Sequence, residues 1–198
     1  DVSALAGCAT LHTLTIMDCW RVVDVSPLAG CVSLHTLNLG GCRGVTDVAA
    51  LVGCPVLHTL KLVDCEQLTD VSWLAGCRTL HTLQIALANA MDVRGLADCA
   101  ALHTLTISSR FGVMDVSVLA DCAALHTLKL VATRLDVSGL AGCAVLHTLE
   151  LRGCDGLTDV SALAGCANLH TLHLSRCERL TDVSALGGCA ALHRLDLD

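Results

Sequence analysis

The chain has 198 residues and a formal net charge of -7, with 54% hydrophobic residues but only 2% aromatic residues. With 16% charged residues and 38 leucines, it is too apolar for a disordered protein. With only two lysines and an acidic balance, it lacks the broad basic surface of a nucleic-acid-binding protein. No run of 18 apolar residues predicts a transmembrane helix, so we expect neither nucleic acid nor a membrane as a partner.

Near-identical units follow one another along the chain without a linker. The string DVSALAGCATLHTL at residue 1 returns as DVSALAGCANLHTL at residue 159, and such self-similarity is the signature of a solenoid. The nine units begin at Asp1, Asp24, Asp47, Asp70, Asp92, Asp115, Asp136, Asp159 and Asp182. We therefore expect residues 1–198 to form a single repeat domain.

Each unit predicts one short strand and one short turn. In the segment Leu-His-Thr-Leu-x-Leu, alternate leucines such as Leu60 and Leu62 point to one face, which is the period of a strand. The segment Asp-Val-Ser-x-Leu-Ala-Gly-Cys has room for a single 3₁₀ or α turn, and Ser26 before Pro27 predicts an N-cap. One unit cannot bury its own apolar side, so stacking predicts a parallel sheet on one wall and turns on the other.

The units resemble a known repeat family across the whole chain. The pattern LxxLxLxxCxxLTDVSxLAxC, intact from Leu57 to Cys77 and present from Leu169 to Cys189 with Gly187 in place of its alanine, resembles the leucine-rich repeat. It combines features of the cysteine-containing class and of the short internalin-like class, and it is similar to arrays encoded by unicellular eukaryotes. The resemblance implies an α/β, right-handed leucine-rich repeat solenoid with its parallel β-sheet on the concave face and short 3₁₀ or α turns on the convex face. It implies a binding scaffold without naming a partner.

The cysteines fall into two columns when the units are aligned. Disulfides or a metal site would be one interpretation, and free thiols acting as small buried hydrophobes would be the other. Equivalent side chains in a stack run parallel, and no CxxC pair exists, so we expect structural free thiols, no metal and an intracellular, cytoplasmic location. The first column is Cys8, Cys31, Cys54, Cys77, Cys99, Cys122, Cys143, Cys166 and Cys189, and the second is Cys19, Cys42, Cys65, Cys154 and Cys177.

Three other columns predict framework roles. Nine of the ten histidines precede the strand, where a structural role, a response to pH and metal binding are all open; we expect each ring to bond to the backbone of a neighbouring loop.

The nine aspartates that open the units are expected to accept backbone N–H bonds at the turns. Without them, 10 acidic residues remain against 12 basic ones, so the variable surface is slightly positive. Threonine follows histidine in eight units and predicts a polar stripe along the sheet.

The outward strand positions after threonine differ from unit to unit. The resemblance implies that such concave residues contact a partner, although they could also vary because nothing constrains them. The candidates on this wall are Asn38, Lys61, Gln84, Thr106, Lys129, Glu150, Arg152, His173 and Arg176. His173 stands outside the histidine column, with Glu150 one unit away, and we expect a solvated polar cluster there rather than an acid–base pair.

The fourth to sixth units lose the second cysteine and the LTD ending. We expect loops over residues 86–91, 108–114 and 131–135, grouped on one edge of the solenoid. Phe111 beside Arg110 predicts an interface anchor, with Leu87 and Arg134 as further contacts. Alternatively, Phe111, Met91 and Met114 fold inward and fill gaps left by the missing repeat residues.

No set of residues predicts catalysis or a cofactor, because every cysteine and all but one histidine belong to a repeated column, whereas an active site is normally unique. We therefore expect a non-catalytic module that binds another protein on its concave strand face or on the irregular edge of units four to six. The alternative is an architectural subunit embedded in a larger assembly. The chain opens and closes in register without capping units, so we expect it to be a fragment of a longer chain, with neighbouring subunits or further repeats at both ends.

Overall fold

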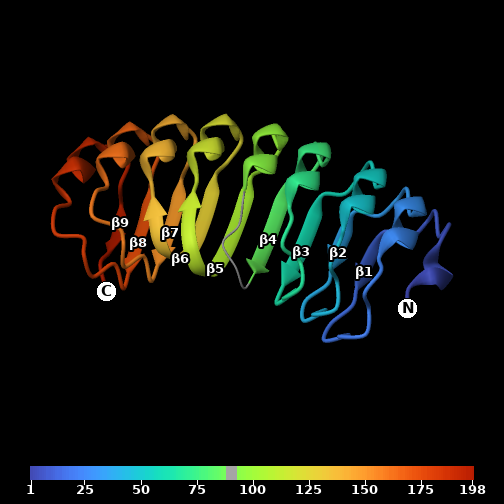
Figure 1. Cartoon of the computed structure of the whole chain (residues 1–198). Helices are drawn as coiled ribbons and strands as arrows, with labels where there is room; N and C mark the ends of the chain where they lie inside the picture. Colours follow the sequence, from blue (N-terminus) through green and yellow to red (C-terminus); the bar gives the residue numbers. More distant parts are fainter. Residues whose placement is uncertain (88–92) are drawn as a thin grey trace.

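The computed structural model describes residues 1–87 and 93–198, without the side chains of Leu87, Thr133 and residues 110–114. Within this part, nine parallel strands form one sheet in sequence order, and 3₁₀ turns alternate with them (Figure 1). The strands are β1 (Thr13–Thr15), β2 (Thr36–Asn38), β3 (Thr59–Val63), β4 (Thr82–Leu87), β5 (Thr104–Asp115), β6 (Thr127–Asp136), β7 (Thr148–Arg152), β8 (Thr171–Ser175) and β9 (Arg194–Asp196). The turns are η1 (Ser3–Leu5), η2 (Ser26–Gly30), η3 (Ala49–Gly53), η4 (Ser72–Gly76), η5 (Arg94–Asp98), η6 (Ser117–Asp121), η7 (Ser138–Gly142), η8 (Ser161–Gly165) and η9 (Ser184–Gly188).

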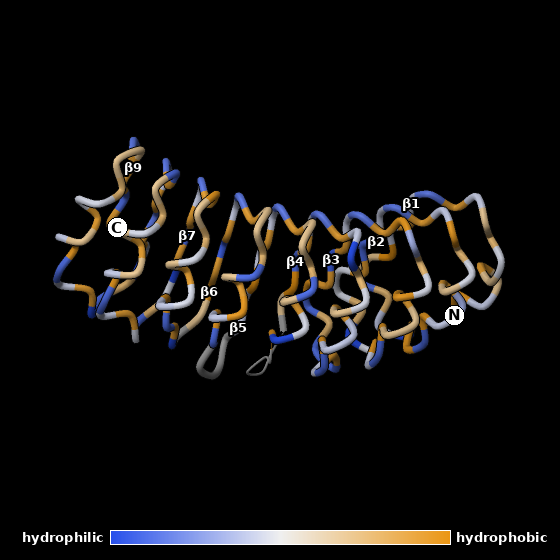
Figure 2. Tube along the Cα trace, turned by 90° about the horizontal axis from the view of Figure 1, so that it is seen from above, coloured by the Kyte–Doolittle hydropathy of each residue, from blue (hydrophilic) through white to orange (hydrophobic). Residues whose placement is uncertain are grey.

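The register of the sheet follows the repeat. Leu37 on β2 pairs with Leu60 on β3, and Thr36 pairs with Thr59, so equivalent residues of successive units lie side by side. The inward leucines are buried, while the residues between them are half-buried on the outer face of the sheet. Burial of each leucine contributes about 1.5–3 kcal/mol. Figure 2 shows polar and apolar segments recurring at corresponding places along the solenoid. The predicted leucine-rich repeat solenoid, with the sheet on the concave wall and 3₁₀ turns on the convex wall, is therefore confirmed.

The aspartate column organises the start of each turn. In eight units, one carboxylate oxygen of the aspartate accepts the backbone N–H two residues later, at 2.7–2.9 Å. This confirms the predicted role of these residues. The predicted serine N-cap is wrong, because Ser26 is the first residue of η2 and Val25 is the N-cap residue, without a side-chain cap. Asp24 supplies the side-chain acceptor instead, and its pKa is lowered by hydrogen bonds from the side chain and backbone of Ser26.

Both cysteine columns pack inside the solenoid. All 14 cysteines lie among the described residues as free thiols, and most are buried. In the first column, seven Sγ atoms lie 3.1–3.4 Å from a leucine carbonyl oxygen of the preceding unit. Burial raises the pKa of Cys77 to about 11 and that of Cys99 to about 12. The buried cysteines of the first column are therefore protonated thiols that link consecutive units, which agrees with the structural role predicted for them.

Units five and six correct the prediction of edge loops. Residues 108–114 and 131–135 belong to β5 and β6, which continue past a bulge between Ser109 and Val113. In five other units, a residue just after the strand has a positive φ and turns the chain inward; these residues are Asp18, Gly41, Asp64, Gly153 and Arg176. Ser109 and Ala132 stand at that position in units five and six and remain in extended strands. Without the left-handed residue, the chain continues as a strand.

Candidate binding site on the concave wall

Four predicted candidates form a row across adjacent strands in the C-terminal half of the sheet. Thr106 on β5 is opposite Lys129 on β6, and Lys129 is opposite Glu150 on β7. His173 on β8 continues the row. Because the strands are parallel and in register, these side chains stand next to one another on the outer face of the sheet. The repeat thus converts one variable sequence position into a continuous row.

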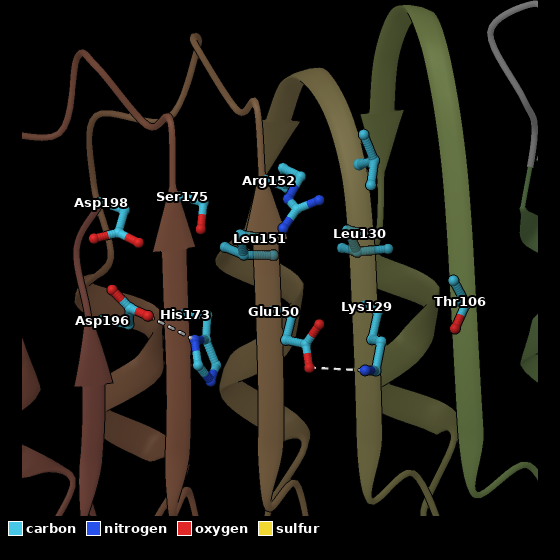
Figure 3. Close-up of a pocket in the computed structure, with 11 residues that line it drawn as sticks. Thr106, Lys129, Leu130, Glu150, Leu151, Arg152, His173, Ser175, Asp196 and Asp198 are labelled. Atoms are coloured by element: carbon cyan, nitrogen blue, oxygen red, sulfur yellow. Dashed lines mark hydrogen bonds and ion pairs between the residues drawn. The ribbon is translucent and has the colours of Figure 1, made fainter.

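Two polar contacts connect this row. The Lys129 Nζ lies 2.8 Å from Oε1 of Glu150, and the His173 Nδ1 lies 3.2 Å from Oδ2 of Asp196 on β9 (Figure 3). The Lys129 and Glu150 side chains are 43% and 38% exposed. Exposed ion pairs of this kind contribute only about 0.2–1 kcal/mol to stability. Their main effect here is to orient the side chains and to neutralise each other's charge.

A second row lies two residues further along the same strands. Arg152 on β7 has Val131 on one side and Ser175 on the other, as the strand register requires. Among the residues that the structure describes, Arg152 takes part in no ion pair. The two rows enclose a hollow of about 400 Å³, which also borders Asp196 and Asp198. This volume is in the range of pockets that hold small ligands or a few side chains of a partner.

The hollow brings together Thr106, Lys129, Glu150, Arg152 and His173. Asn38, Lys61 and Gln84 lie on β2, β3 and β4 of the same wall but do not border it, and the Oδ1 of Asn38 accepts the backbone N–H of Gly40 at 3.1 Å. Arg176 follows β8 with a φ of 55° and borders a separate hollow beside Cys177. Arg134 is exposed near the end of β6. The predicted candidates therefore divide between the hollow and other parts of the surface.

The proposed anchor at Arg110 and Phe111 and the contact at Leu87 involve side chains outside the described residues, as does Met114. Met91 lies in the undescribed segment 88–92. The anchor therefore stays a prediction. The irregular edge itself differs from the prediction, since its backbone in units five and six is strand.

Six residues that border the hollow were not among the predicted candidates, namely Leu130, Val131, Leu151, Ser175, Asp196 and Asp198. Asp196 is the most informative of these, because it, and not Glu150, contacts His173. The sequence feature that could have identified Asp196 is its position in the same variable column as His173, one unit later. Glu150 instead contacts Lys129 in the preceding unit.

The nine column histidines form a continuous stack beside the strands. Neighbouring rings lie 4.3–4.8 Å apart, centroid to centroid, with interplanar angles of 7–11°. The predicted bonds from the rings to a neighbouring loop are absent from six described rings, whose Nδ1 instead lies 3.3–3.4 Å from the hydroxyl of the next threonine. The backbone makes the link between units, for example from His58 N–H to the carbonyl oxygen of His35 at 2.9 Å.

The stack is poorly suited to hold a metal ion or extra protons. Parallel rings direct equivalent nitrogens in the same direction, whereas metal ligands must converge on one point at about 2.0–2.1 Å. No group of three or more metal-ligating side chains occurs among the described residues. Burial, followed by repulsion from the neighbouring rings, lowers the pKa of His58 and of His126. The geometry therefore favours neutral, stacked imidazoles.

The array of parallel strands and 3₁₀ turns defines the class of protein. A family model described as "Leucine Rich repeat" matches residues 165–186. The chain therefore has the leucine-rich repeat fold, and one of its units matches the family model. Domains of this class typically bind proteins or other ligands and are typically non-catalytic. Over the part of the chain that is described, no helix has the length and apolar character needed to cross a membrane.

Solved structures from bacteria and plants share the fold. An internalin, InlF, from Listeria monocytogenes is 21% identical with a TM-score of 0.77, and the match covers 100% of this chain and 64% of that one. Internalin C2 from the same organism is 26% identical with a TM-score of 0.61, over 95% of this chain and 71% of that one. The Arabidopsis receptor kinase HAESA, solved with the peptide hormone IDA and the co-receptor SERK1, is 16% identical with a TM-score of 0.73, over 96% of this chain and 34% of that one. The chain thus spans less than two thirds of InlF, and no curated protein matches it in sequence.

Proposed function

We propose that the chain is a non-catalytic protein-binding module whose concave wall over β5 to β9 receives a segment of a partner protein. One observation carries the proposal: the framework columns repeat almost unchanged, whereas Lys129, Glu150, Arg152 and His173 differ in type and converge on one hollow. A surface whose only role was to stabilise the solenoid would not require four different polar side chains around one hollow. The solved complex of HAESA with a peptide hormone supports the idea that a wall of this fold can receive a peptide.

The size and character of the hollow support a segment rather than a metabolite. Its volume of about 400 Å³ is shared between charged, hydroxyl and aliphatic side chains spread over five strands. Adjacent strands are about 4.8 Å apart, so the row from Thr106 to Asp196 extends about 19 Å. An extended peptide of about six residues spans that length. Binding of the peptide would bury the aliphatic side chains of the hollow, and the polar side chains would set the position of the peptide along the row.

A peptide selection tests the proposal. A library of random 12-residue peptides displayed on phage is panned against the 198-residue chain, and selected peptides are measured by calorimetry against Lys129→Ala and against the matched control Lys61→Ala. Lys61 lies on β3 of the same wall but away from the hollow. We expect at least about a fivefold loss of affinity for Lys129→Ala and none for Lys61→Ala, since interface truncations that matter cost about 1 kcal/mol or more. Failure to select any peptide, or equal effects of the two variants, would contradict the proposal.

We also propose that the protein works in a reducing intracellular compartment, which the 14 free thiols support. Alkylation of protein isolated from its native source under denaturing conditions, followed by mass spectrometry, tests this. We expect all 14 cysteines to be alkylated without prior reduction. Disulfides at the column positions would contradict it.

A further inference from the structure

Most charges around the concave hollow have a partner within the protein. The Lys129 ammonium contacts the Glu150 carboxylate at 2.8 Å, and His173 contacts Asp196 at 3.2 Å. Arg152 is the one cation of the hollow without an ion pair within the described chain, and the Asp198 carboxylate has none there either. The hollow thus presents one cation that nothing in the described protein neutralises.

The surroundings of Arg152 explain why it stays unpaired. Glu150 is two residues earlier on the same strand and therefore on the same face, but its Oε1 contacts Lys129 instead. Figure 3 shows one oxygen of the Glu150 carboxylate directed to the Lys129 ammonium. Val131, which is 38% exposed, lies opposite Arg152 on β6, and Ser175 lies opposite on β8. The guanidinium therefore has an aliphatic neighbour on one side and a hydroxyl on the other.

This arrangement suits a carboxylate. A guanidinium presents a planar fork of N–H donors that can bind both oxygens of a carboxylate at once. The Ser175 hydroxyl can add a donor beside it. The remaining carboxylates at the hollow, Asp196 and Asp198, lie toward β9, about 10 Å from Arg152 at two strand spacings. They disfavour a doubly charged phosphate and favour a basic residue of the partner at that end.

We propose that Arg152 anchors an aspartate or glutamate side chain of the partner, so that the bound segment carries an acidic residue over β7 and runs toward β9 with a basic residue. This inference rests on the proposed function and specifies the chemistry of its partner. Because Lys129 and His173 already have internal partners, the partner protein gains most from the Arg152 guanidinium, which has no ion pair among the described residues.

A double-mutant cycle tests the inference. The probe is a peptide selected on the wild-type chain, together with analogues in which its acidic residue is replaced by the uncharged amide or by phosphoserine. We expect the wild type to bind the acidic peptide roughly tenfold to a hundredfold more tightly than the amide analogue. Arg152→Ala should bind both peptides equally, and Arg152→Lys should restore part of the preference. The matched control Arg179→Ala, at an exposed arginine that does not border the hollow, should keep the full preference.

The outcomes separate this inference from the proposed function. Selected peptides without an acidic residue, or a preference that survives in Arg152→Ala, would overturn the carboxylate anchor while leaving the concave site intact. Tighter binding of the phosphoserine analogue would overturn it in favour of a phosphorylated partner. If no peptide can be selected, the proposed function itself fails. Circular dichroism of each variant checks that the solenoid is still folded.

Discussion

The Sγ of Cys65 lies 3.2 Å from the carbonyl oxygen of Leu39, one unit earlier in the solenoid. The thiol therefore donates a hydrogen bond across the stack while its sulfur fills a buried position. Burial raises the pKa of Cys65 to about 12. The second cysteine column thus contributes both packing and a weak polar link between units.

Thiol reactivity should separate the buried cysteines from the exposed one. Alkylation needs the thiolate, so Cys65 and Cys99, whose pKa burial raises to about 12, should resist iodoacetamide at pH 8 in the folded protein. Cys19 is exposed and should react faster than either of them. Peptide mapping after short labelling times measures the three rates. Comparable rates for Cys19 and Cys65 in the folded state would contradict the buried column, and labelling in urea provides the control.

The histidine stack predicts a loss of stability in mild acid. The folded-state pKa of His58 and of His126 lies below the ordinary value of 6.5, so the unfolded chain binds more protons below that pH. Their contribution to stability is full above pH 6.5 and is lost as the pH falls through the lowered folded value. The pKa of Asp24 and of Asp182 is lowered from 3.8, so the stability that these carboxylates contribute is present across this range and is lost only at pH values below 3.8.

Urea unfolding at pH 8, 7, 6 and 5 measures this effect. We expect the midpoint to fall between pH 7 and pH 5, and His58→Gln to reduce the dependence. A control substitution at an exposed position, Arg179→Ala, should leave the slope unchanged. A midpoint that rises as the solution is acidified through this range would show that the stacked rings gain protons on folding, which is the opposite of the expected behaviour.

Close approach of neighbouring turns predicts a steric defect at Gly139. A Cβ at Gly139 would clash with the Cα of Ser117 and lie 2.7 Å from its backbone nitrogen, so backbone would have to move. We expect Gly139→Ala to destabilise the chain by about 1–3 kcal/mol. Gly187→Ala is the matched control in η9, where a Cβ has nothing within 4 Å. Thermal unfolding should show a lower Tm only for Gly139→Ala; equal Tm values would mean that the turns are not so tightly stacked.

The aspartate column predicts a smaller, chemically specific effect. Asp159 accepts the backbone N–H of Ser161 at 2.7 Å, and its other oxygen accepts the Ser161 hydroxyl at 3.0 Å. Asp159→Ala removes both acceptors and should cost about 1 kcal/mol, as for other side-chain caps of helical turns. Asp159→Asn keeps one oxygen acceptor and should retain most of the stability. The urea unfolding midpoints of both variants measure this difference. Equal losses of stability in the two variants would show that the hydrogen bonds to the carboxylate do not account for the effect.

The framework could be predicted from the sequence because each structural position is repeated. Leu37 and Leu60 occupy the same place in consecutive units, so one alternation pattern fixes the whole sheet. The lengths of β5 and β6 could not be predicted as easily, because they depend on which residues adopt a positive φ. Asp64 and Arg176 do so with a φ of 55°, and arginine carries no sequence preference for that conformation.

The positions of the candidate residues on the outer face of the sheet could be predicted from the sequence, but the contacts between their side chains could not. The outward positions of Lys129, Glu150 and His173 follow from strand alternation. The ion-pair partner of each side chain does not follow from strand alternation. By sequence and register, Glu150 is close enough to pair with Lys129, Arg152 or His173. In the structure Glu150 contacts Lys129, and Arg152 has no carboxylate partner among the described residues.

The most direct test of the concave site is a chemical-shift map of the 198-residue chain titrated with a selected peptide. We expect the amides perturbed most strongly to lie on β5 to β9, at Lys129, Glu150, Arg152, His173 and Ser175, where the side chains border the hollow. The 3₁₀ turns η2 to η8 on the convex side should be unaffected. Perturbations concentrated on those turns, or on β1 to β3, would contradict a binding site at this hollow.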